Sequence, residues 1–174
     1  MGMKRIRLKE FTFLVPPARV SRNWRSFALT THPVAELPNA PILCAVSGEP
    51  FSFEMRLSIP PGGYVGLCAY HLDTVFASVG ANTNSIRAFS MIRGYPSTTI
   101  HPFSTDRDTL IWRMRWDRKR TLIGFQREED DPVSWVGTFE LPGTASSISF
   151  GPFFASDGQA YRATGEDLRF IPSE

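Results

Sequence analysis

Residues that turn the chain recur at nearly even spacing, and this rhythm limits the fold more than any other feature of the sequence. Turn-forming clusters begin at positions 60, 71, 81, 94, 104, 117, 128, 142 and 156, at intervals of 10 to 14 residues. The 13 glycines and 14 prolines are scattered over the whole chain, so no long helix fits between them. Short segments between evenly spaced turns are typical of a β-sandwich or a β-barrel.

The segments between these turns carry strand patterns. Residues 51–59 alternate strictly between apolar and polar side chains, as in a strand with one buried face. Residues 60–63 then force a turn, since proline lacks a backbone donor and glycine accepts positive φ angles. Residues 64–70 are almost continuously apolar, which predicts a central strand covered on both faces. The pattern continues to residue 171 and predicts an all-β fold.

The segment at 109–116 separates tryptophans from arginines. Trp112, Met114 and Trp116 share one face of this expected strand, which predicts that they lie in the core. Arg113 and Arg115 share the other face and are expected to point outward. The polar face begins a ridge of five basic residues between positions 113 and 120, which passes through a charged turn at 117–120.

Two descriptions of this ridge remain open. It is an ordinary polar sheet face if its arginines pair across strands, with Glu128 or Glu140 as the expected partners. It is a contact surface for an anionic sugar, a phosphate or an acidic protein if the arginines are exposed and unpaired. We favour the first description.

One segment departs from the strand rhythm. Val20, Trp24 and Phe27 fall at helical spacing within residues 19–31, where no glycine or proline intervenes, so a short helix is the alternative there. Three prolines between positions 33 and 41 predict an extended loop over residues 32–41. We find no linker, repeat or low-complexity tract, and we therefore expect a single domain over residues 1–174.

Composition and charge narrow the classes of partner. The net charge of +2 argues against nucleic acid, and no apolar run approaches the roughly 20 residues of a membrane span. The N-terminal apolar run ends at Pro16, which makes it too short for an export signal. We therefore expect a soluble cytoplasmic protein with Cys44 and Cys68 as reduced thiols. The sequence leaves the oligomeric state open.

Several short motifs, taken in order, resemble a known superfamily. The runs FSFEMRLSI-PPGG-YVGLCAY, VFASVGAN, LIWRMRWDRKRTLIGFQREEDDPVSWVGTFEL, ISFGPFFAS and GEDLRF are similar to the concanavalin A-like lectin/glucanase superfamily. Within it, the chain most resembles regulation-of-enolase-type domains (DUF1349-like) and the C-terminal sandwich domains of family 43 glycosidases. The matching positions are Gly66, Leu67, Trp112–Trp116, Trp135, Gly151 and Asp167–Phe170. The resemblance covers residues 42–171 and implies a two-sheet antiparallel jelly-roll sandwich.

The resemblance also tells which chemistry to look for. Catalytic members carry two acidic residues on one strand, which flank the glycosidic bond. The acidic run at 128–131 is consecutive and precedes Pro132, so we expect a solvated turn partly neutralised by Arg127. Asp167 matches the place where related sandwiches hold a structural calcium ion. Calcium takes six to eight oxygen ligands and only this carboxylate matches, so we expect no cofactor.

The remaining candidates for a ligand site are aromatic and basic. Three tyrosines beside expected loops offer flat rings for the apolar faces of sugars. His71 lies two residues before Asp73, a spacing that suits a ligating pair or a proton relay. The predicted ligand-binding residues are Tyr70, Tyr95, Tyr161, His71, Arg113 and Arg115.

Three functions follow from these observations. The resemblance, together with the missing acid pair of the catalytic members, implies a non-catalytic recognition domain, with carbohydrate as the expected ligand. An intracellular regulatory or interaction domain that binds an acidic protein surface through the basic ridge is the alternative. A glycoside-active enzyme with an atypical site is the third.

Overall fold

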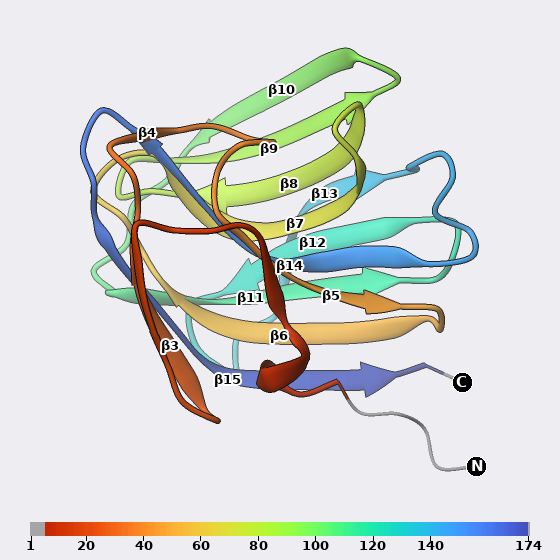
Figure 1. The fold of residues 1–174 in the computed structure, drawn as a ribbon, viewed down its shortest axis with the longest axis horizontal. Helices are drawn as coiled ribbons and strands as arrows, with labels where there is room; N and C mark the ends of the chain where they lie inside the picture. Colours follow the sequence, from red (N-terminus) through yellow and green to blue (C-terminus); the bar gives the residue numbers. More distant parts are fainter. Residues whose placement is uncertain (1–5, 174) are drawn as a thin grey trace.

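The protein is a sandwich of two antiparallel sheets in a computed structural model that describes residues 6–173 (Figure 1). Its one helical element among these residues is the single 3-10 turn η1 (Leu8–Glu10). The predicted fold class, an all-β two-sheet sandwich, is confirmed. No helix in the described range is long and apolar enough to cross a membrane.

Sheet A forms one layer. In spatial order its strands are β1 (Thr12–Val15), β5 (Ile42–Ser47), β14 (Ile148–Asp157), β7 (Tyr64–Leu72), β8 (Val75–Ala81), β9 (Ser85–Ile92) and β10 (Tyr95–Pro102). The short strand β4 (Val34–Ala35) also pairs with β14. Because β4 belongs to the predicted loop over 32–41, that loop is anchored along the edge of β14.

Sheet B forms the second layer. In spatial order its strands are β13 (Ser134–Phe139), β12 (Thr121–Gln126), β11 (Thr109–Trp116), β6 (Phe51–Ser58), β15 (Arg162–Pro172), β3 (Ser26–Thr30) and β2 (Arg19–Arg22). Figure 1 shows β12, β11, β6 and β15 side by side in that order. Neighbouring strands therefore come from distant parts of the chain, as in other jelly-roll sandwiches.

Aromatic rings fill the space between the sheets. Phe150 of β14 lies 4.2 Å from Phe51 and 5.2 Å from Phe53, both on β6, measured between ring centroids. Phe11 and Phe170 close the group at 5.7 and 5.8 Å from Phe150. Each fully buried ring contributes roughly 1.5 to 3 kcal/mol through the hydrophobic effect. These contacts between sheets hold the two layers together.

The alternating patterns place side chains as predicted on two strands. In β6 the apolar residues are buried and the polar residues between them are partly exposed. In β11, Trp112, Met114 and Trp116 are each 1% exposed and belong to the core. The prediction that these three residues are core residues is confirmed, and Arg113 and Arg115 lie on the opposite, outer face.

The helical alternative for residues 19–31 is wrong. This segment is the hairpin of β2 and β3. The Asn23 side chain makes the turn, because its Oδ1 accepts the backbone N–H of Arg25 at 2.8 Å and of Ser26 at 2.9 Å. Beyond the turn, burial alternates with period two, with Phe27 and Leu29 inside. Trp24, whose spacing suggested a helix face, is 76% exposed at the tip.

Candidate functional site

The predicted ligand-binding residues lie on opposite sides of the sandwich. Tyr70 is on β7 and packs on the outer face of sheet A, beside a small apolar cluster that includes Cys68 and Phe153. Arg113 and Arg115 lie on the outer face of sheet B. Since two packed sheets are about 10 Å apart, with side chains beyond them on both sides, these groups cannot contact one small ligand.

Tyr161 is buried, which contradicts its selection as an exposed ring beside a loop. Its hydroxyl donates a hydrogen bond to the carbonyl oxygen of Ala155 at 2.7 Å, and its backbone N–H donates to Oγ1 of Thr31 at 3.0 Å. Burial, with a smaller contribution from the charge of Asp157, raises the pKa of the phenol well above its usual value. Tyr161 therefore stabilises the segment 155–161, and its ring is not accessible to a ligand.

Two further predicted residues lie at chain turns. Tyr95 begins β10 after a tight two-residue turn and is 78% exposed. In that turn, Arg93 and Gly94 both have positive φ angles, 52° and 83°, as hairpins of this length require. His71 is exposed near the end of β7, where its ring lies beside Gly143. Within residues 6–173, Tyr70 pairs with Phe76 and Asp73 and with neither of these two residues, so the structure does not gather them into one cluster.

The outer face of sheet A carries a continuous aromatic band. Tyr70 of β7 and Phe76 of β8 are 6.2 Å apart and stacked, and Phe89 of β9 lies 5.6 Å from Phe76. The guanidinium carbon of Arg87, also on β9, is 5.9 Å from the ring centroid of Phe89. It lies 4.3 Å above the ring of Tyr64. We call these five residues the aromatic band.

A charged pair lies at the Tyr64 end of the band. Nη2 of Arg87 is 3.3 Å from Oε2 of Glu36, which comes from the loop over 32–41. The Arg87 side chain is only 15% exposed, because rings flank it. The hydroxyl of Tyr64 shares a hydrogen bond of 2.9 Å with Oγ of Ser85. This end of the band therefore presents both hydrogen-bond donors and acceptors next to rings.

The hydroxyl at the other end of the band is also fixed. The Tyr70 hydroxyl donates a short hydrogen bond to Oδ1 of Asp73. Burial is the main cause of the raised pKa of Tyr70, and this hydrogen bond is the second cause. The tyrosine is therefore neutral at physiological pH, and its ring is held in place. Tyr70 and Phe89 are both partly exposed.

The cysteines beneath the band are unsuited to catalysis. Cys44 and Cys68 are not joined by a disulfide. Burial raises the pKa of Cys44 to about 12. Burial, together with the neighbouring Cys44, also raises the pKa of Cys68 well above its usual value. Because the thiolate is the reactive form, neither residue is a nucleophile at neutral pH.

The basic ridge is divided rather than continuous. Arg113 forms an ion pair of 2.8 Å with Glu54, its neighbour on β6. Arg115 lies 5.7 Å from the ring centroid of Trp135. Arg118 turns to the end of the sandwich and pairs with Glu49 at 3.1 Å. The favoured description, a cross-strand paired polar face, therefore applies to Arg113, although with Glu54 in place of the expected Glu128 or Glu140.

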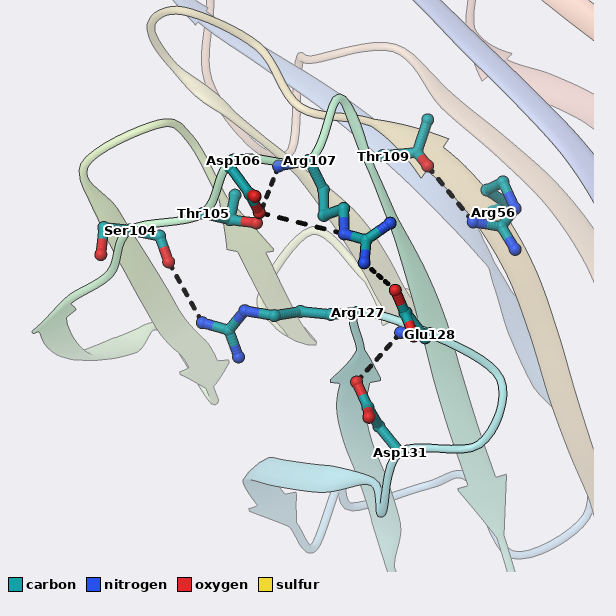
Figure 2. Close-up of polar contacts among 9 residues, drawn as sticks. All are labelled: Arg56, Ser104, Thr105, Asp106, Arg107, Thr109, Arg127, Glu128 and Asp131. Carbon is teal, nitrogen blue, oxygen red and sulfur yellow. Dashed lines mark hydrogen bonds and ion pairs between the residues drawn. The ribbon is translucent and has the colours of Figure 1, made fainter.

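The acidic run at 128–131 is a hairpin turn, as expected, but its neutralising partner differs. Figure 2 shows Arg107 beside the carboxylate of Glu128, with which it forms a close ion pair. Arg127 instead donates to the backbone carbonyl of Ser104 at 3.2 Å. Asp131 folds back, and its carboxylate accepts the backbone N–H of Glu128 at 3.2 Å. Glu128 is thus paired with an arginine of another loop, and Asp131 is occupied within its own turn.

Asp167 stands on the surface beside an arginine. Its carboxylate is 3.6 Å from Nε of Arg56, and its φ angle of 55° marks an irregularity in β15. Residues 6–173 contain no group of three histidine, cysteine or acidic side chains that could hold a metal ion. Asp167 therefore offers a calcium ion one carboxylate that already has a cationic partner.

Sequence reasoning missed most of the aromatic band. It selected Tyr70 but not Phe76, Arg87 or Phe89. The alternation on β9 places Arg87, Phe89 and Met91 on one face, and the assembled sheet turns that face outward. Large apolar side chains on an outer face indicate contact with something beyond the sheet.

Comparison by sequence finds no counterpart. No family model matches the chain, and no curated protein matches it. The fold must therefore be compared through solved structures.

Solved structures share the whole architecture at low identity. A functionally unknown protein from Saccharomyces cerevisiae matches with a TM-score of 0.83 and 12% identity, over 97% of this chain and 100% of that chain. The GH43 protein BlXynB mutant (K247S) from Bacillus licheniformis matches with a TM-score of 0.72 and 14% identity, over 94% of this chain and 37% of that chain. The Crh5 transglycosylase matches with a TM-score of 0.58 and 13% identity, over 93% and 79% of the two chains. The chain has the concanavalin A-like jelly-roll fold that its motifs predicted.

Proposed function

We propose that the protein is a non-catalytic recognition domain that binds carbohydrate on the outer face of sheet A. The single observation that carries this proposal is the aromatic band, in which exposed parts of rings stand next to a charged pair. Tyr70 and Phe89 supply the rings, and Arg87 with Glu36 supplies the polar groups.

The chemistry of the band matches that of a sugar ring. A pyranose has apolar C–H faces and a rim of hydroxyl groups, so it needs flat apolar contacts together with donors and acceptors. The ring of Tyr64 is covered by Arg87, which leaves Phe89 and Tyr70 as the stacking surfaces. Arg87 donates and Glu36 accepts, so together they suit neighbouring hydroxyls of a neutral sugar.

The side chains of the aromatic band are also preorganised for binding. The Tyr70 ring is held by Asp73 and packed against Phe76. Arg87 is held between rings and by Glu36. Side chains that are already ordered lose little conformational entropy on binding.

The structural comparisons support carbohydrate as the ligand class. Similar structures include a xylan beta-1,4-xylosidase from Bacillus halodurans, a Bacteroides ovatus protein described as Xyloglucan PUL GH43B, and the Crh5 transglycosylase in complex with NAG. This chain corresponds to 32% and 37% of the first two chains. We therefore choose β-1,4-linked xylose and glucose chains as the first probes.

Binding rather than catalysis fits the acids at the band. A glycosidase needs two carboxyl groups that flank one bond, one of them free to donate a proton. Glu36 is paired with Arg87, and Asp73 accepts the Tyr70 hydroxyl. Both acids therefore act as fixed hydrogen-bond acceptors in this arrangement.

Isothermal titration calorimetry with xylohexaose and cellohexaose tests the proposal. We expect at least one to bind, and Phe89→Ala to weaken binding roughly tenfold through the lost stacking surface. The matched control is Val20→Ala, which shortens an exposed apolar side chain on sheet B and should leave affinity unchanged. Failure of both oligosaccharides to bind, or equal affinity in Phe89→Ala, would refute the proposal.

A further inference from the structure

The outer face of sheet B contains a row of side chains that crosses five strands. The strand registers align Trp135 of β13, Gly124 of β12, Arg113 of β11, Glu54 of β6 and Arg169 of β15. Figure 1 shows these strands in the same order. Because Gly124 has no side chain, the Trp135 ring adjoins Arg115 across the gap, with the guanidinium carbon 5.7 Å from the ring centroid.

Two hollows meet on this row. The first encloses about 80 Å³ and is bordered by Trp135, Arg115 and Glu54. The second is bordered by Trp24 and Arg25 at the tip of the β2–β3 hairpin. Both hollows are also lined by Arg169 and Ile171. They therefore form one track, which we call the arginine track, from Trp135 over β15 to Trp24.

The arginine track is cationic and has an arginine on a tryptophan at each end. Its lining includes two acidic residues, Glu54 and Asp167, and five arginines, which are Arg7, Arg25, Arg113, Arg115 and Arg169. The guanidinium carbon of Arg25 lies 4.0 Å above the ring of Trp24, and Arg115 lies near Trp135. Asp167 is already engaged by Arg56. The two ends thus combine a cation with a flat apolar ring.

One carboxylate already lies within the track. Glu54 is only 13% exposed, and its two oxygens lie 2.8 Å from Nη2 of Arg113 and 3.4 Å from Nη1 of Arg169. The arginines of the row are therefore arranged to hold a carboxylate, the group that guanidinium matches with paired hydrogen bonds. Within residues 6–173, neither Arg25 nor Arg115 forms an ion pair with a carboxylate.

We propose that the arginine track binds an acidic polysaccharide, a chain of sugars that carry carboxylates. Arg25 and Arg115 bind carboxylates of the ligand, and Trp24 and Trp135 contact the C–H faces of its sugars. This site is separate from the aromatic band, on the opposite side of the sandwich, and does not depend on it.

A carboxylated sugar chain fits better than a single-stranded nucleic acid. Nucleic-acid surfaces are strongly basic. Here two acids lie in the track, and the net charge of the chain is only +2.

The test measures the affinity of the full chain for an oligogalacturonate of six residues at low and physiological salt. We expect binding that weakens as salt rises, because exposed charges are screened. Arg25→Glu and Arg115→Glu should each lower the affinity about fivefold or more. Arg118→Glu, at the end of the sandwich where Arg118 pairs with Glu49, should leave it unchanged.

The controls separate this site from the aromatic band. Phe89→Ala should leave oligogalacturonate binding intact, and Arg115→Glu should leave xylohexaose binding intact. No oligogalacturonate binding, or equal losses in all three arginine variants, would overturn the proposal. Tighter binding of an oligothymidylate than of the oligogalacturonate would overturn it in favour of nucleic acid.

Discussion

Replacing Arg87 with alanine tests whether the aromatic band is built as described. The substitution removes the guanidinium that lies 4.3 Å above the Tyr64 ring and 5.9 Å from Phe89, together with its ion pair to Glu36. It leaves the rings themselves in place. The change in the free energy of unfolding therefore reports how strongly this cation is held against the band.

The expected loss in the free energy of unfolding follows from the contacts that Arg87 makes. A cation over an aromatic ring contributes about 0.5 to 1 kcal/mol when exposed and about 2 when desolvated. Arg87 is 15% exposed, so we take about 1 kcal/mol for this contact. The pair with Glu36, whose side chain is 53% exposed, adds about 0.5 kcal/mol after screening by solvent. Arg87→Ala should therefore cost about 1 to 2 kcal/mol and lower Tm by about 3 to 6 °C.

Urea denaturation monitored by fluorescence measures this loss of stability. Two further variants separate the contribution of the ring contact from that of the ion pair with Glu36. Arg87→Lys keeps the charge near Glu36 but not the planar stack, so it should recover less than half of the lost stability. Glu36→Gln removes only the ion pair and should cost about 0.5 kcal/mol. If Arg87→Ala is as stable as the unchanged protein within about 0.3 kcal/mol, the guanidinium is not held by the rings and Glu36 as described.

Three further predictions concern stability. Phe150→Ala, at the centre of the core rings, should cost about 3 to 5 kcal/mol in urea denaturation, and a loss below 1 kcal/mol would contradict the packing described. Ser78→Ala should not destabilise, because the buried Ser78 hydroxyl has no hydrogen-bond partner within residues 6–173; a loss above about 1 kcal/mol would reveal one. Backbone hydrogen bonds from Arg120 and Lys119 lower the pKa of Asp117, so its carboxylate stabilises the fold above pH 4 and that contribution fades as pH falls further. Asp117→Ala should therefore be less stable than the unchanged protein at pH 7, and the difference should shrink below pH 4; a pH-independent difference would refute this.

The architecture was predictable because its signals are local. The alternation in β6 and the separation of tryptophans from arginines in β11 depend on neighbouring residues only, and both predictions are confirmed. The helical alternative for residues 19–31 was wrong because it also rested on a local signal. The spacing of Val20, Trp24 and Phe27 is a local coincidence, and the turn made by the Asn23 side chain decides the structure.

The candidate site was less predictable because distant residues build it. Arg87 meets Glu36 across 51 positions of sequence, and no local pattern indicates that partner. Tyr161 looked accessible because turn residues surround it, yet its hydroxyl is taken by the Ala155 carbonyl. Which face of β9 is covered depends on where sheet B lies, and this follows from the assembled fold rather than from the alternation itself.

NMR of the isotopically labelled protein during titration with xylohexaose, and separately with cellohexaose, tests whether carbohydrate binds to the aromatic band. With at least one of them we expect backbone amide signals to shift on β7 and β9, around Tyr70, Arg87 and Phe89, while those of β11 and β15 remain unchanged. Shifts confined to sheet B, or no shifts at millimolar sugar for either xylohexaose or cellohexaose, would contradict this expectation.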